Sequence, residues 1–121
     1  MPDALDRAAL DDLLAMAGGD ASLFVELLDS FLADADQYAT ELDAAIAAHD
    51  DAALVRPAHS LKSNAMNVGA TRLAELCRAL ELDARGGPVP EAGPRVADVQ
   101  AELAQVRAAV AAAREEAAGG A

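Results

Sequence analysis

Apolar residues recur along most of this chain at the three-and-four spacing of an amphipathic helix. The spacing predicts a first helix over residues 3–17, ended by two glycines, and a second from an Asp20 cap to about residue 48. A third helix runs to about Val68, and Thr71 can cap a fourth. Residues 86–94 are rich in Gly and Pro and are expected to form a loop, with Pro94 in the first turn of a last helix.

The apolar positions of these helices form stripes that predict a shared core. The stripe of the second helix consists of Phe24, Leu27, Phe31, Ala35, Tyr38, Leu42 and Ile46. The fourth and last helices carry Leu73, Leu76, Cys77 and Leu80, and Val96, Val99, Leu103, Val106 and Val110. Narrow seams of this kind are typical of bundles. The pattern predicts an all-α fold, an up-and-down antiparallel four-helix bundle with a short additional N-terminal helix. We expect one domain over residues 1–118 and a flexible tail over 119–121.

Pro57 conflicts with the predicted third helix. In a helix interior, proline removes one backbone hydrogen bond and clashes with the preceding turn. Either residues 51–55 form a separate turn and Pro57 begins the helix, or the helix kinks or restarts near Pro57. We favour the kinked or restarted helix, because the apolar periodicity from Leu54 to Val68 is continuous.

Composition supports helices and excludes several classes of protein. The chain has 33 alanines but only two Phe, one Tyr and no Trp, which favours helix over sheet. No apolar run is long enough to span a membrane, and the N-terminus is too acidic for a signal peptide. The single cysteine, Cys77, leaves no internal disulfide and no cysteine-based zinc site. We therefore expect a cytoplasmic protein that has no association with membranes.

Charge is distributed unevenly along the chain. The formal net charge of −12 makes general nucleic-acid binding unfavourable, because phosphates would be repelled. Residues 1–51 hold 13 acidic residues and one basic residue, whereas residues 52–85 hold five basic and three acidic residues. A locally positive segment in an acidic protein indicates a site that handles negative charge.

That positive segment contains a histidine that a helical wheel places away from the core. The opposite, core-facing side consists of Leu54, Ala58, Leu61, Ala65 and Val68. Beside His59 lie Arg56 and Lys62, and the apolar residues Val55 and Met66 stand on what should be the solvated face. An exposed imidazole is a potential nucleophile, and nearby cations favour its neutral form and can stabilise a phosphoryl group. An apolar rim around a charged centre is typical of a docking surface. By themselves, these residues favour an ordinary solvated histidine with flanking charges over a functional site.

Two consecutive stretches carry a more specific signal. Residues 58–70 read AHSLKSNAMNVGA, and residues 73–81 read LAELCRALE. Together they resemble the histidine-containing phosphotransfer (HPt) domain family, which has a Leu two residues, a Lys three residues, a small residue four residues and a Gly ten residues after the histidine. The resemblance covers residues 20–85 well and the flanking helices only by pattern.

The resemblance implies a four-helix bundle that relays phosphoryl groups. His59 would be phosphorylated on its outer ring nitrogen, Lys62 would be the accessory cation, and Ser63 would be the small residue that lets a partner approach. Gly69 would close the helix. From the residues themselves we expect Arg56 to add electrostatic support and Leu61 and Cys77 to be structural core residues. We expect partner contacts at Val55, Met66 and Asn67.

The same resemblance implies partners that complete the reaction. We expect a response-regulator receiver domain, which brings the acceptor Asp and Mg²⁺, and a histidine kinase, hybrid or otherwise. This chain is expected to bind no cofactor or metal. It has neither a GxxxxGK[ST] nor a GxGxxG motif, so we expect no autonomous kinase activity.

Two other functions remain open at this level. One is an HPt-like binding module that sequesters or regulates a receiver or kinase without transferring phosphate. The other is a generic helical adaptor whose exposed apolar face binds a partner helix. The presence of both His59 and Lys62 favours transfer, because a pure binder needs neither. The second histidine, His49, is interpreted as a residue at a helix C-terminus, where its partial positive charge suits the helix dipole.

Overall fold

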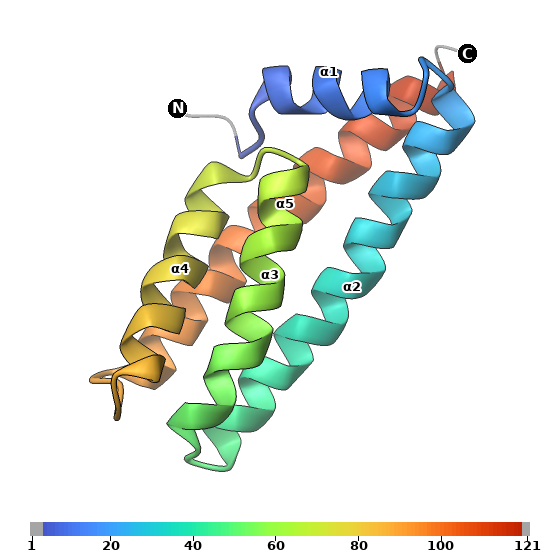
Figure 1. Cartoon of the computed structure of the whole chain (residues 1–121). Coiled ribbons are helices and arrows are strands. Elements are labelled where there is room, and N and C mark those ends of the chain that lie inside the picture. Colours follow the sequence, from blue (N-terminus) through green and yellow to red (C-terminus); the bar gives the residue numbers. More distant parts are fainter. Residues whose placement is uncertain (1–3, 120–121) are drawn as a thin grey trace.

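The computed structural model describes residues 4–119 of the chain. Its helices are α1 (Arg7–Met16), α2 (Ala21–Ala47), the short 3₁₀ helix η1 (Asp51–Leu54), α3 (Val55–Asn67), α4 (Thr71–Arg85) and α5 (Ala92–Gly119). Helices α2 to α5 run alternately up and down as a four-helix bundle, and α1 lies across one end of it (Figure 1). The predicted fold class is therefore confirmed.

Three predicted helix boundaries shift by a few residues. Helix α1 begins at Arg7 rather than near residue 3, because the Asp6 side chain accepts from the backbone N–H of Ala8 at 3.0 Å and caps the helix. Residue 3 itself lies outside the described residues. The prediction that Thr71 caps α4 was wrong, since Ala70 holds the cap position without a side-chain hydrogen bond. Helix α5 begins inside the predicted loop, and Pro94 does lie in its first turn.

Pro57 fits α3 without breaking it. Residues 51–54 form the separate 3₁₀ turn, whose N-terminus is capped by Asp50, and the α-helix restarts at Val55. Pro57 is then the third helical residue, where a backbone N–H has no partner within the helix. Its missing donor therefore costs no helical hydrogen bond, and His59 follows in a regular α-helix.

The core runs the length of the bundle between the four long helices. The predicted seam of α5 is confirmed, because all five of its valine and leucine residues are buried. On α2, the buried positions include Leu28, Ala39 and Ala45, whereas Leu27, Tyr38 and Ile46 lie half-buried on the flank of the stripe. Small side chains thus face the centre of the bundle there. Among residues 4–119, no helix is long and apolar enough to cross a membrane.

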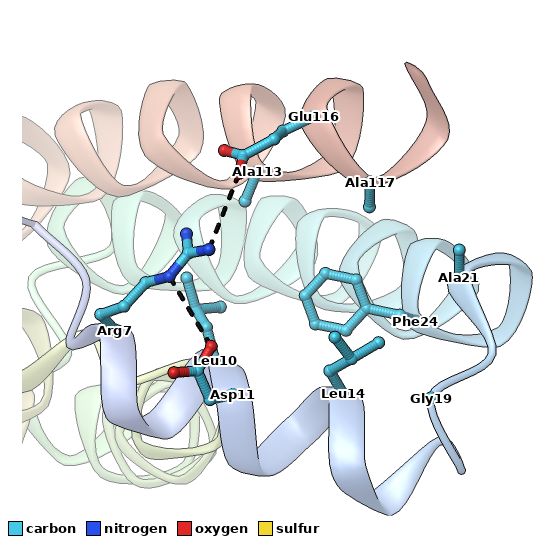
Figure 2. A pocket seen from close by; sticks show the side chains of 10 residues that line it. All are labelled: Arg7, Leu10, Asp11, Leu14, Gly19, Ala21, Phe24, Ala113, Glu116 and Ala117. Carbon is cyan, nitrogen blue, oxygen red and sulfur yellow. Dashed lines mark ion pairs between the residues drawn. The ribbon is translucent and has the colours of Figure 1, made fainter. Parts of the chain in front are cut away.

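Helix α1 closes the end of the bundle formed by α2 and α5. Figure 2 shows Leu10 and Leu14 projecting from α1 toward α2, which carries Phe24, and toward α5, which carries Ala113 and Ala117. Because those alanines are small, a shallow pocket of about 260 Å³ remains between the three helices. Arg7 pairs with Asp11 and Glu116 at 3.6 and 3.7 Å, but these side chains are exposed, so the pairs add little stability.

The start of α1 is held against the turn between α3 and α4. The Asp6 backbone N–H donates to the Gly69 carbonyl at 2.7 Å. Gly69 has φ +74°, and a Cβ there would lie 2.6 Å from the Ala9 Cβ and 2.9 Å from the Asp6 carbonyl oxygen. This position therefore needs glycine both for its backbone conformation and for the close approach of α1.

Gly69→Ala is accordingly expected to lower the free energy of unfolding by about 1–3 kcal/mol, measured by urea denaturation. Gly18→Ala is the matched control, because Gly18 has φ +68° but open space around its Cα. Gly18→Ala should lose only the backbone contribution. Equal losses in the two variants would contradict the packing role of Gly69.

Candidate functional site

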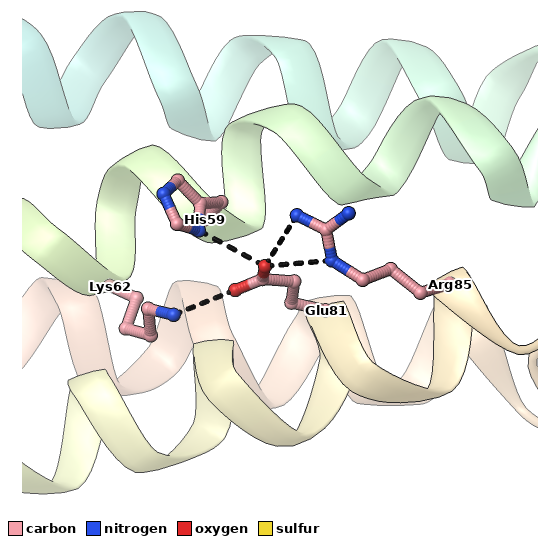
Figure 3. Close-up of polar contacts among 4 residues, drawn as sticks. All are labelled: His59, Lys62, Glu81 and Arg85. Carbon is pink, nitrogen blue, oxygen red and sulfur yellow. Dashed lines mark hydrogen bonds and ion pairs between the residues drawn. The ribbon is translucent and has the colours of Figure 1, made fainter.

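His59 lies on α3 with its imidazole half in solvent. Its side chain is 52% exposed, and its Nδ1 lies 3.0 Å from Oε2 of Glu81 on α4. A carboxylate can only accept a hydrogen bond, so Nδ1 carries the hydrogen. In the neutral ring, this leaves the lone pair on Nε2, which points away from Glu81 in Figure 3. The predicted exposure of His59 is thus present, together with a fixed ring orientation.

Glu81 is the buried anion at the centre of this cluster. Its side chain is only 7% exposed, and it accepts hydrogen bonds from Lys62, Arg85 and His59. Burial by itself raises the pKa of the Glu81 carboxyl, but the hydrogen bonds from Lys62, Arg85 and His59 outweigh it and lower the pKa to about 2. Glu81 is therefore ionised at neutral pH and stays a hydrogen-bond acceptor only.

Two cations share this carboxylate from opposite sides (Figure 3). Lys62 Nζ donates to Oε1 at 2.9 Å, and Arg85 donates to Oε2 through Nε at 2.9 Å and Nη2 at 2.8 Å. Lys62 is only 22% exposed, so it lies half-buried at the edge of the predicted solvated face rather than fully on it. Its stem packs inward because the ammonium reaches the buried carboxylate on the neighbouring helix.

Arg56, which the wheel places beside His59, stands apart from this cluster. Its side chain is exposed and makes no hydrogen bond or ion pair with any other residue in the 4–119 range. In the sequence, Arg56 and Lys62 look like two similar cations near the ring. In the structure, the charge of Lys62 is paired with that of Glu81, and the second cation of the cluster is Arg85.

The expected partner-facing residues differ in how far they reach solvent. Ser63, one turn after His59, is exposed, as are Asn67 and Met66, the last at 64%. Val55 is half-buried and packs against the core.

Met66 also lines a hollow of about 420 Å³ between α1, α2 and α3, together with Met16 of α1. Met16 is 81% exposed, although no motif in the sequence marks it as a surface residue.

The three residues expected to be structural are buried. Leu61 and Cys77 are fully buried, and Gly69 makes the close turn described above. Burial raises the pKa of the Cys77 thiol to about 12, against a smaller lowering effect of the Lys62 charge. The thiol therefore stays protonated at neutral pH, and an uncharged, inaccessible thiol is unreactive.

Glu81 and Arg85 are the members of the cluster that sequence reasoning missed. Two signals were available in the sequence. Glu81 directly follows Leu80 and lies four residues after Cys77, so it falls on the edge of an apolar stripe. Glu81 and Arg85 also have the i, i+4 spacing of a helical ion pair. Neither signal points to His59, because His59 and Glu81 lie on different helices, 22 residues apart in sequence.

The lowered pKa of Glu81 predicts a pH-dependent contribution to stability. A carboxyl whose pKa is depressed from 4.5 to about 2 stabilises the folded state above its unfolded pKa and loses this effect as pH falls toward the folded value. The stability advantage of the wild type over Glu81→Gln should therefore shrink between about pH 5 and about pH 3. Urea denaturation across this range measures it.

The control for this experiment is Glu75→Gln, which removes an exposed glutamate earlier on the same helix. The Glu75 variant should follow the wild type at every pH. An advantage of the wild type over Glu81→Gln that stays constant with pH would contradict the ionised, hydrogen-bonded carboxyl.

Fold and site together define a class of protein: a four-helix bundle that presents one half-exposed histidine, oriented by a buried carboxylate. The family model of the Hpt domain matches residues 26–109. The crystal structure of histidine-containing phosphotransfer protein B (HptB) from Pseudomonas aeruginosa PAO1 is similar, with 32% sequence identity and a TM-score of 0.87 over 96% of this chain and 98% of that chain. A search of curated proteins found no match.

This chain belongs to the Hpt domain family, as the resemblance in the sequence predicted. It is a phosphotransfer protein of a phosphorelay. Proteins of this family interact with receiver domains or kinases.

Proposed function

We propose that His59 accepts a phosphoryl group on Nε2, from a receiver-domain Asp or a histidine kinase, and passes it to the receiver Asp of a response regulator. The observation that carries this proposal is the hydrogen bond between Nδ1 and Glu81 at 3.0 Å. It holds the ring so that Nε2, the nitrogen with the lone pair, points away from Glu81 (Figure 3).

The transfer step needs little covalent chemistry from this chain. The Nε2 lone pair attacks the phosphorus of an aspartyl phosphate, the N–P bond forms, and the P–O bond to the aspartate carboxylate breaks. The Nδ1 hydrogen stays in place, so the phosphorylated ring carries a positive charge. The ionised Glu81 lies beside that charge and stabilises it. The Mg²⁺ that supports the step would be held by the receiver domain.

Charge and access around His59 suit a phosphoryl group. Lys62 comes one turn after His59, and its ammonium can donate hydrogen bonds to phosphoryl oxygens. Ser63 is small and exposed, so it leaves room for a partner beside the ring. Met66 and Asn67 extend the exposed face of α3 for docking, whereas Val55 is half-buried and exposes only part of its side chain.

A transfer assay tests this function directly. A panel of ³²P-labelled phospho-receivers is mixed with the protein in the presence of Mg²⁺, and the label on the protein is followed over time. We expect label that is labile in acid and stable in base, as a phosphoramidate bond is, and a phosphopeptide that contains residue 59. Label on another residue, or none from any receiver or kinase, would contradict the proposal.

A further inference from the structure

The Glu81 carboxylate is bound unequally by its two cations. Among residues 4–119, one oxygen, Oε1, accepts from Lys62 alone. The other, Oε2, accepts from His59 and takes two hydrogen bonds from the Arg85 guanidinium. Arg85 stands four residues after Glu81 on the same helix, so the two side chains lie on one face of α4. Lys62 reaches across from α3, the helix that carries His59.

A phosphoryl group on His59 would compete with Glu81 for Lys62. The group adds negative charge within one turn of the lysine, and a flexible ammonium can move between two anions. Glu81 is 7% exposed, and a buried carboxylate that loses its only counter-ion is strongly destabilised. Lys62 is therefore free to move only if another cation stays with Glu81.

We propose that Arg85 is the fixed counter-ion of Glu81 and, by holding it, frees Lys62 for the phosphoryl group. Arg85 is in this sense a positioning residue, which acts through Glu81 and Lys62. Its two hydrogen bonds keep Oε2 in place to accept from Nδ1 of His59 when Lys62 leaves Oε1. This inference rests on the proposed phosphorylation of His59.

If Arg85 holds Glu81 while Lys62 binds the phosphoryl group, the effects of substituting Arg85 and Lys62 on the transfer rate are not independent. Without Arg85, and before the ring of His59 becomes positively charged, Lys62 is the one cation that the described residues leave on the buried carboxylate, and it stays there. Phosphoryl transfer in Arg85→Gln should then fall by about tenfold or more, as when a stabilising donor is removed. The double variant with Lys62→Gln should be no slower than Lys62→Gln alone, because Arg85 acts through a lysine that is already missing.

The rate of phosphorylation by phosphoramidate tests this without any partner protein. In this reaction the N–P bond of the donor breaks, ammonia leaves, and the bond to Nε2 of His59 forms. The variants are Arg85→Gln, Lys62→Gln, their combination, and Arg78→Gln as the control, an exposed arginine on the same helix. Thermal melting accompanies each rate. Transfer to a receiver is then measured for the same set.

A rescue variant separates positioning from simple support of the fold. Glu81→Gln in the Arg85→Gln background removes the charge that retains Lys62, while the amide oxygen still accepts from Nδ1. We expect this double variant to regain part of the lost rate but to stay below the wild type, because the negative charge beside the phosphorylated ring is also gone. We also expect ¹⁵N NMR to find hydrogen on Nδ1 of His59 in the wild type and in the rescued variant.

Several outcomes would overturn the inference while the proposed function stands. They are a rate for Arg85→Gln equal to that of Arg78→Gln, independent effects of Arg85 and Lys62, or no recovery on adding Glu81→Gln. If Arg85→Gln does not fold, the transfer rate of the double variant Arg85→Gln with Glu81→Gln tests the inference instead. If the wild type is phosphorylated by neither phosphoramidate nor any receiver, the proposed function fails and the inference fails with it.

Discussion

His59→Gln is expected to abolish phosphoryl acceptance and leave the protein folded. The amide nitrogen of glutamine is no nucleophile, so no N–P bond can form at residue 59. The side chain of His59 is 52% exposed, and Glu81 keeps its hydrogen bonds from Lys62 and Arg85, so the bundle should lose little stability. The measurements are label transfer from a phospho-receiver, thermal melting, and binding of the same receiver.

The matched control is His49→Gln, which changes the other histidine of the chain, an exposed residue in the turn after α2. It should accept phosphate at the rate of the wild type. Binding that persists in His59→Gln without transfer separates docking from chemistry. A wild type that binds a receiver but takes no label would favour the non-transferring regulatory module, and label retained by His59→Gln would place the phosphoryl group elsewhere.

Leu61→Ala is expected to lower the free energy of unfolding by about 2–5 kcal/mol, the cost of truncating a buried leucine. Leu61 is 0% exposed and lies on the face of α3 opposite His59. Its truncation would leave a cavity between α3 and its neighbours in the bundle. Because a small domain is stable by only about 5–15 kcal/mol, this loss is a large part of the total. Urea denaturation monitored by circular dichroism measures it.

Leu82→Ala is the control, because Leu82 is 54% exposed on α4. It should change stability by no more than about 0.5 kcal/mol. Where Leu61→Ala remains folded at low temperature, it should still accept phosphate, since Leu61 touches none of the hydrogen bonds around His59. An unchanged unfolding curve would contradict the assignment of Leu61 to the core.

The helices were predictable because each buries a stripe of apolar residues, and a stripe is a local property of the sequence. The seam of α5 shows this most clearly, since every predicted residue is buried. Boundaries were less predictable, because a cap depends on backbone angles as well as on residue type. At Thr71 the tight turn after Gly69 placed Ala70 at the cap position instead. On α2, hydropathy favoured Tyr38 over Ala39, although the smaller residue faces the centre.

Only the part of the candidate site that lies on the His59 helix could be predicted from the sequence. A wheel of residues 54–68 indicates that His59 is exposed and that Lys62 is one turn away. It cannot indicate that Lys62 turns inward to a carboxylate, because that carboxylate belongs to α4. Arg56 lies close to His59 in the sequence and Arg85 lies far from it, so the sequence favours Arg56 as the supporting cation. In the structure, it is Arg85 that shares an acceptor with His59.

The all-α class, the order of the helices, the core face of most of them and the histidine motif can be read from the amino-acid sequence. These follow from periodicity and from short-range patterns, which the chain carries whatever its neighbours do. Three features appear only once the helices are packed: which nitrogen of His59 is held, which cations pair with Glu81 and where α1 closes the bundle. The physical reason is that hydrogen bonds and ion pairs act over a few ångströms, and only the packing of α3 against α4 brings residues 59 and 81 within that range.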